Sequence, residues 1–386
     1  MWDSPEALQD ICVEYISRNI NLVFNAVLDV NGNTLKYLFK NSLLRFPCSV
    51  SEQLFSALND IGLTDQLLTI FDPSVTRLNR VYIGEDSKIS VKGLRVLRFH
   101  KISELSAVGL NNIAISELVG CLSDWTLENL FLLNVSNSTF LSSEKVRIFI
   151  ALSKLKNLIC LDVSFTEFNS QGLEIVAEDL RCLENLNISG TKVIDISPLK
   201  KCKDRLKFLS MYNLKISHTS TFMPVLQKLH KLQHLDISDD KDEPYELASV
   251  NMSAFSEFLK DPTCLPSLIS LDITGKNGVD ADTLKAFLSN HPQMRFLGLL
   301  ETEACQDDFF CEISDPVFKH KLVQLWLLLW EGEVCWLVGV VSFKRSNGSP
   351  AWKSQLLTVP QSFHYTALSG KEILPSFAEL QVLMDK

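Results

Sequence analysis

The chain has 386 residues, a formal net charge of -9 and a pI near 5.4. Because domains average about 150 residues, this length predicts two or three units. Apolar residues make up 46% and charged residues 22%, which is ordinary for a folded protein and excludes a largely disordered one. The acidic balance, with no basic stripe in view, argues against a nucleic-acid partner, since phosphate binding needs clustered lysine and arginine.

The cellular compartment follows from the first residues and from the cysteines. The start carries acidic side chains where a signal peptide needs basic ones, and no apolar run follows it. The ten cysteines form no C-x-x-C pair, and several lie at apolar positions. This pattern predicts reduced, buried thiols in a cytoplasmic or nuclear protein.

The first predicted element is a helix. Ser4-Pro5-Glu6 is typical of a helix start, because serine can cap it, proline is tolerated in the first turn and glutamate complements the dipole. Leu8, Cys12 and Ile16 follow at four-residue spacing, which places them on one face of that helix. Two interpretations remain open: the ridge binds another protein, or it packs on the chain's own domain.

Further along, a hexad with the pattern Leu-x-x-Leu-x-apolar recurs, which indicates an internal repeat. Its eight copies begin at Leu94, Leu130, Leu158, Leu183, Leu206, Leu232, Leu268 and Met294. Most of the spacings fall within the roughly 20–29 residues of a leucine-rich repeat, and two need insertions. Each hexad predicts a short strand whose alternate apolar side chains point to one side.

The segments between hexads carry helical patterns. Residues 169–180 and 280–288 have apolar residues at helical spacing, and Asp280 can cap the second segment. The crossover that contains Pro198 is shorter, which predicts a single turn or an irregular stretch. Together the hexads and helices predict an α/β leucine-rich-repeat solenoid over residues 91–310, after a helical segment over residues 1–90.

The fifth position of the hexads is mostly polar and should face the concave side of the strands. The residues are Asn134, Asp162, Asn187, Ser210, Asp236 and Asp272. Such a stripe fits a surface for a protein partner, as solenoids commonly provide. The other interpretation is that these side chains bond neighbouring backbone groups and contribute only solubility.

Residues 311–386 form a divergent tail without hexads. Residues 322–341 are apolar and rich in tryptophan, but Glu331-Gly332-Glu333 lies at their centre. Two carboxylates at mid-bilayer would cost roughly 2.5–3.5 kcal/mol each, so we expect no membrane span. The alternatives are a hairpin that turns at Gly332 and caps the last repeat, or a poorly ordered terminus.

A family resemblance joins these parts. The box Leu8-x-x-x-Cys12-x-x-x-Ile16 resembles the one by which ubiquitin-ligase substrate receptors bind elongin C within the elongin B and elongin C pair. Downstream, an apolar-proline element similar to the one that selects Cullin-2 consists of Phe46, Pro47, Val50 and Leu54. This order of parts, followed by the repeats, resembles the Zyg-eleven family of Cullin-2 receptors, and within it the A-type members.

The resemblance implies a non-catalytic, substrate-recruiting subunit that binds elongin C, elongin B, Cullin-2 and protein substrates, with no cofactor. Members of the family continue into armadillo-like repeats, to which the resemblance assigns recognition of N-terminal glycine degrons. No such repeats are found in residues 311–386, so we expect no glycine-degron site here. The alternative function is a leucine-rich-repeat interaction protein that belongs to no ligase and uses its N-terminal helices as a cap.

Catalytic and metal-binding motifs were also sought. The sequence contains no glycine-rich phosphate loop, no Gly-x-Ser-x-Gly elbow and no His-Glu-x-x-His helix. His230 and His234 are four residues apart, but no third ligand at suitable spacing accompanies them. We therefore expect neither an enzyme nor a metal site.

Overall fold

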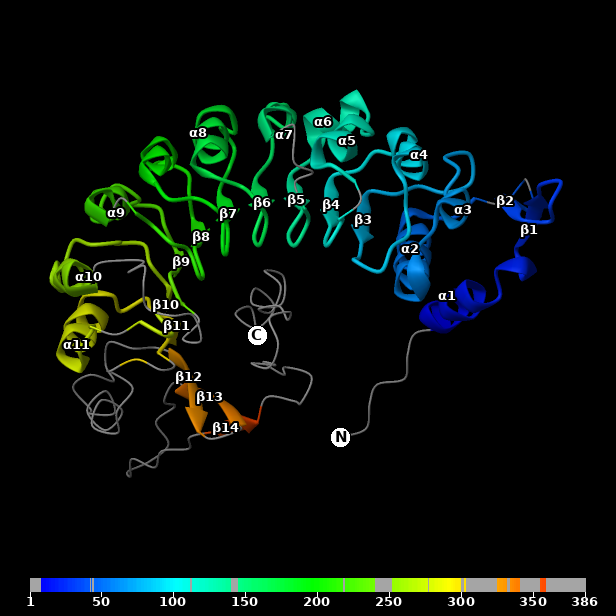
Figure 1. The fold of residues 1–386 in the computed structure, drawn as a ribbon. Helices are drawn as coiled ribbons and strands as arrows, with labels where there is room; N and C mark the ends of the chain where they lie inside the picture. Colours follow the sequence, from blue (N-terminus) through cyan, green and yellow to red (C-terminus); the bar gives the residue numbers. More distant parts are fainter. Residues whose placement is uncertain are drawn as a thin grey trace. The chain divides into compact units, whose positions relative to one another are not determined.

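A computed structural model gives the fold (Figure 1). It describes residues 8–41, 43, 45–111, 113–139, 145–217, 219–239, 252–276, 278–299, 302, 325–331, 334–340 and 355–358. The helix start predicted at Ser4 lies outside these residues. The chain divides into two compact units, the first ending at Leu232 and the second beginning at Gln233.

The first unit opens with helices and one hairpin. Its elements are α1 (Leu8–Arg18), η1 (Ile20–Leu22), β1 (Phe24–Leu28), β2 (Thr34–Phe39), α2 (Cys48–Gly62) and α3 (Asp65–Leu68). Strands β1 and β2 are antiparallel, with Phe24 opposite Phe39. The ring of Phe39 contacts those of Phe24 and Phe46, each at 5.1 Å between centroids. The prediction of helices throughout this segment was therefore wrong at the hairpin.

Parallel strands follow. They are β3 (Arg80–Ile83), β4 (Glu104–Ala107), β5 (Leu132–Asn134), β6 (Cys160–Asp162), β7 (Asn185–Asn187) and β8 (Phe208–Ser210). Each pairs with the next, so that the central leucine of one hexad lies beside that of its neighbour, as Leu133 does beside Leu161. These leucines are buried. The predicted α/β leucine-rich-repeat fold is confirmed.

One predicted hexad, the copy at Leu94, is wrong. Leu94 ends α4 (Val91–Leu94), and Leu97 lies in η2 (Arg95–Phe99), so the segment is helical. Leu94 and Leu97 are three residues apart, a spacing that places both on one face of a helix. Ser90 caps the helix by accepting from the backbone amides of Lys92 and Gly93. The parallel ladder instead begins with β3 and β4.

Helical segments lie on one side of the strands in the first unit (Figure 1). Besides α4 and η2 they are α5 (Ile115–Gly120), α6 (Asp124–Asn129), α7 (Lys145–Leu152), α8 (Ser170–Asp179), η3 (Ser197–Cys202) and α9 (Thr219–Leu226). The α8 helix is capped by Asn169, which accepts from the amide of Gly172. The short η3 carries Pro198 in its first turn, which confirms the predicted short crossover.

The turns after the parallel strands share a left-handed residue. Three residues beyond the ends of β5, β6, β7 and β8, the backbone has a positive φ at Asn137, Phe165, Gly190 and Asn213. Asparagine and glycine tolerate this conformation, whereas a bulky side chain does so only at an energetic cost. Phe165, with φ 53°, is therefore a strained exception among these turns.

The second unit has the same strand and helix order. Its elements are β9 (His234–Asp236), α10 (Met252–Lys260), β10 (Ser270–Asp272), α11 (Ala281–Asn290), β11 (Phe296–Gly298), β12 (Leu325–Glu331), β13 (Val334–Val340) and β14 (Gln355–Thr358). Strands β9, β10 and β11 are parallel. Asp280 caps α11 by accepting from the amide of Thr283, as predicted.

The tail contains the predicted hairpin. Strands β12 and β13 are antiparallel, with Glu331 opposite Val334, and β14 pairs with β13. Strand β12 also lies parallel to β11, so the hairpin continues the ladder after the last hexad. Within the described ranges, no helix combines the length and the apolar character that crossing a membrane requires.

Candidate functional site

The outer face of α1 carries an apolar ridge, which we define as Leu8, Ile11, Cys12 and Tyr15. These residues have the i, i+3, i+4, i+7 spacing of a single helical stripe. Leu8 is 76% exposed and Tyr15 60%, and Ile11 and Cys12 are also exposed. Of the predicted box residues, Leu8 and Cys12 thus lie on this ridge, while Ile16 at its border is half-buried.

The opposite face of α1 packs on α2 through small and polar side chains. Val13 and Ser17 are the buried residues of α1. The Gln53 side chain of α2 accepts from Gln9 at 2.6 Å and donates to Asp10 at 2.9 Å. Helix α1 therefore buries its less apolar side and leaves its most apolar side to solvent, which reverses the usual arrangement.

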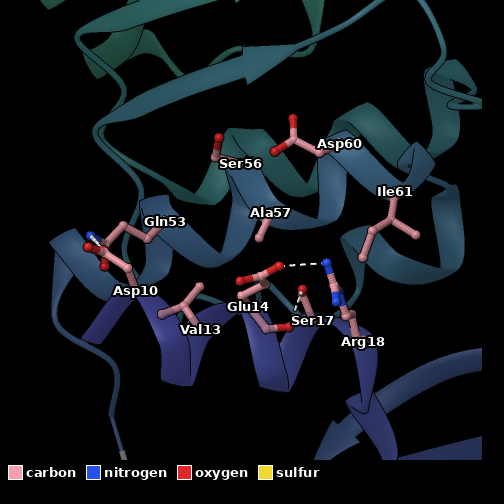
Figure 2. A pocket seen from close by; sticks show the side chains of 10 residues that line it. All are labelled: Asp10, Val13, Glu14, Ser17, Arg18, Gln53, Ser56, Ala57, Asp60 and Ile61. Carbon is pink, nitrogen blue, oxygen red and sulfur yellow. Dashed lines mark hydrogen bonds and ion pairs between the residues drawn. The ribbon is translucent and has the colours of Figure 1, made fainter. Parts of the chain in front are cut away.

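A polar groove runs beside the contact between α1 and α2 and is lined by residues of both helices (Figure 2). It encloses about 430 Å³ and receives Glu14 and Arg18 from α1, which form an ion pair at 2.5 Å, and Ala57 and Asp60 from α2. Because the ridge residues are not among its lining residues, the groove and the ridge are separate features of α1. Contiguous exposed apolar surface on a folded protein commonly marks a binding site, and here that surface is the ridge.

The predicted Cullin-2 element lies at the start of α2. Pro47 precedes the first helical residue and is exposed, while Phe46 and Val50 are half-buried. The Phe46 amide donates to the carbonyl of Val75 at 2.8 Å, which fixes the entry of the chain into the helix. Leu54 is only 2% exposed and belongs to the core, so it cannot contact a partner while α2 keeps this packing.

Sequence reasoning missed the β1–β2 hairpin as an exposed apolar feature. Its exposed residues include Leu28, Val30, Leu35 and Leu38. The signal that could have revealed it is Asn31-Gly32 between two segments rich in apolar residues, a pair that favours tight hairpin turns.

In the first unit, the polar row on the strands is bonded internally. Asn134 and Asn187 each accept from the amide two residues ahead, and Asp162 accepts from both the amide and the hydroxyl of Ser164. The Asn187 side chain also donates to Asp162 at 3.0 Å. Burial raises the pKa of the Asp162 carboxyl. These hydrogen bonds satisfy nearby backbone groups, as the second interpretation expects, and a partner surface on this row stays a prediction.

In the second unit, Asp236 and Asp272 occupy the same row and lie beside each other on β9 and β10. Each accepts from the backbone amide two residues ahead, that of Ser238 or Thr274. Burial and the neighbouring charge of Asp236 raise the pKa of Asp272 to about 6. A side chain added to Gly298, beside them on β11, would lie 2.2 Å from a carboxylate oxygen of Asp272.

In the part of the chain that the structure describes, histidine and cysteine side chains form no metal site, because no group of three or more His, Cys, Asp or Glu there could hold a metal ion. Burial, with a smaller contribution from Arg295, lowers the pKa of His234 to about 4. Seven cysteines in the described ranges are free, and burial raises the pKa of Cys264 to about 12, typical of an inert thiol.

Comparisons with known proteins agree with the repeats. A family model described as Zer-1-like, leucine-rich repeats, matches residues 174–299. Protein zer-1 homolog of Homo sapiens is 26% identical over 314 residues, which cover 71% of this chain and 37% of that protein. The homologue of Mus musculus is 25% identical over 377 residues, covering 79% of this chain and 45% of that protein. The chain thus spans less than half the length of these curated relatives.

Among solved structures, internalin C2 of Listeria monocytogenes is 16% identical, with a TM-score of 0.32, over 62% of this chain and 84% of that one. The complex of TLR13 with ssRNA13 gives 14% identity and a TM-score of 0.40 over 68% of this chain and 38% of that one. The narrower resemblance to A-type members stays a prediction. The repeats and the matched relatives thus show that this chain is similar to the Zer-1 homologues, which are related to the Zyg-eleven family.

Proposed function

We propose that this protein is a non-catalytic, substrate-recruiting subunit of a Cullin-2 ubiquitin ligase and that it binds elongin C through the ridge on α1. The single observation that carries the proposal is the orientation of α1, which leaves Leu8 and Cys12 exposed. Had these side chains packed inside the chain, the helix would serve only as a cap of the repeats. The relatives add support, although they are about twice as long or longer.

In this proposal the ridge has its binding conformation before the partner docks. Docking would bury Leu8 and its neighbours without requiring the chain to refold, since α1 already rests on α2. Burying a leucine side chain contributes about 1.5–3 kcal/mol, so Leu8, three-quarters exposed before docking, would contribute about 1–2 kcal/mol. Elongin B would follow as the partner of elongin C.

Cullin-2 would contact the start of α2. Pro47 is exposed there, and Phe46 and Val50 keep part of their surface free. Leu54 is left out of the proposed contact because it is buried. We place the complex in the cytoplasm or nucleus, with substrates held on the remaining surface.

The test is direct binding of the purified chain to purified elongin B and elongin C, measured by calorimetry. The variant Leu8→Ser with Cys12→Ser should bind at least about tenfold more weakly, because both contacts lose apolar area. Val30→Ser is the matched control, since Val30 is apolar and fully exposed but lies in the hairpin turn. Equal affinity of the double variant and the control would refute docking through the ridge.

A second outcome favours the alternative function. If neither the natural chain nor the control binds elongin, while both fold as judged by circular dichroism, the ligase assignment fails. The chain would then be a leucine-rich-repeat interaction protein whose N-terminal helices act as a cap.

A further inference from the structure

A basic segment connects β3 to β4 on the helical side of the first unit. Between residues 87 and 103 there is no aspartate or glutamate, in a chain whose net charge is -9. The exposed cations of this segment are Lys88, Lys92, Arg95, Arg98 and Lys101. The incorrect hexad at Leu94 concealed this cluster, because in a strand Arg95 and Arg98, three residues apart, would point to opposite sides. Helical α4 and η2 bring the two arginines to one groove.

The groove holds about 450 Å³ between η2 and α5. Arg95, Arg98 and Phe99 line it on one side and Glu117 on the other. The buried thiol of Cys121, which lies 3.7 Å from the carbonyl of Val91, also borders it. The groove thus combines two guanidinium groups with an apolar ring and a mostly apolar border.

The two guanidinium groups of the groove can pair with a ligand. Among the residues that the structure describes, neither Arg95 nor Arg98 has an ion-pair or hydrogen-bond partner for its side chain. Glu117 is exposed, and one of its carboxylate oxygens accepts from the amide of Ala114 at 3.3 Å. Elsewhere in the same unit, exposed lysines such as Lys201 do pair with a carboxylate.

Aromatic rings alternate with these cations. Phe99 is 68% exposed beside Arg98, although a phenylalanine normally gains from burial. Lys101 lies over the ring of Trp125, 5.5 Å from its centroid, which holds the ammonium group above an apolar surface. Positive charges next to exposed rings fit a ligand that is both acidic and apolar.

We propose that this groove binds an acidic segment of a partner protein, whose carboxylates pair with Arg95 and Arg98 while an apolar side chain covers Phe99. The charge of the groove selects the partner, because guanidinium groups bind carboxylates through paired hydrogen bonds. A nucleic acid fits less well. Its long row of phosphates would extend beyond this small basic area and meet the rest of a chain whose net charge is -9. The proposal does not depend on elongin binding.

The test uses the full chain and two fluorescein-labelled peptides of equal length. One alternates glutamate with leucine and phenylalanine, and its counterpart has glutamine in place of every glutamate. The acidic peptide should bind at least about tenfold more tightly, and the difference should shrink in high salt as the charges are screened. Equal binding of the two peptides would overturn the proposal.

Matched variants locate the binding. Arg95→Glu with Arg98→Glu should weaken binding of the acidic peptide by about tenfold or more, and Phe99→Ser should weaken it less. The control is Lys228→Glu with Lys231→Glu, which makes the same change of charge at two exposed lysines outside the groove.

Two results would contradict the assignment. If the control pair weakens binding as much as the arginine pair, the effect is one of net charge and the groove is not the site. If single-stranded RNA binds more tightly than the acidic peptide and is equally sensitive to the arginine pair, the partner is a nucleic acid. Circular dichroism of every variant establishes that loss of binding is not loss of fold.

Discussion

Within the predicted Cullin-2 element, Leu54 is expected to stabilise the fold and not to contact a partner. It lies on the inner face of α2 with Phe55 and Leu58, and all three are at most 2% exposed. The ring of Phe55 contacts that of Phe71 at 4.9 Å, so this core is closely packed. Truncating a buried leucine in such a core leaves a cavity as well as losing apolar contact. We therefore expect Leu54→Ala to act on stability.

The expected cost of Leu54→Ala is about 2–5 kcal/mol in the free energy of unfolding, the range for buried leucines. At roughly 2–4 °C per kcal/mol for a unit of this size, the melting temperature should fall by about 4–20 °C. Val50→Ala, one helical turn earlier and half-buried, should cost clearly less. Thermal unfolding followed by circular dichroism measures both.

Cullin-2 binding completes the test of Leu54. At a temperature where both variants are folded, Leu54→Ala should bind Cullin-2 with elongin as the natural chain does, whereas Pro47→Ala with Val50→Ala should bind more weakly. A Leu54→Ala variant that melts like the natural chain and loses Cullin-2 would show that Leu54 is a contact residue. The packing of α2 described above would then be wrong.

Two further predictions concern the second unit and a matched site in the first. Gly275→Ala should lower the free energy of unfolding by about 2–5 kcal/mol, because φ is 75° and the new carbon would lie 2.3 Å from the carbonyl oxygen of Asp239. Gly62→Ala should cost only about 1–2 kcal/mol, because Gly62 also has a positive φ but no atom lies within 4 Å of the new carbon. Equal losses in urea unfolding would contradict the close approach. Asp272 keeps its proton up to a pKa of about 6 when folded and loses it near 3.8 when unfolded, so its contribution to stability falls as pH rises between these values. Asp272→Asn should therefore stabilise the protein at pH 7.5, by at most about 3 kcal/mol, and a less stable variant in urea unfolding at that pH would refute this.

The repeats could be predicted because the same spacing of apolar residues recurs many times along the sequence. A hexad such as the one at Leu158 places three buried side chains at fixed spacing, and the same spacing recurs along the chain. The first strands escaped detection because Val81 and Ile102 occupy hexad positions at which the pattern requires leucine. Leu94 and Leu97 satisfied the pattern by helical coincidence. Spacing alone does not separate a short helix from a short strand.

The candidate site could be predicted in part. The four-residue spacing of Leu8 and Cys12 identified a common face, but it could not tell which face of α1 would be buried. That choice depends on α2, whose Gln53 forms hydrogen bonds with the polar side of α1. Ile11 and Tyr15 escaped notice because the family box does not include them. The basic groove was missed because it depends on the helical turn that follows β3.

Phe165 limits which repeats could be removed from this solenoid by protein engineering. Its ring lies over Gly190, where an added side chain carbon would be 2.5 Å away, and it meets the ring of Tyr212 edge-on at 6.1 Å. Three successive turns are thereby interlocked, so their residues cannot vary independently. Excising residues 166–190 would seat this ring against the next turn, where Asn213 stands in place of the glycine. Modular exchange, ordinarily tolerated in solenoids, is thus restricted at this point.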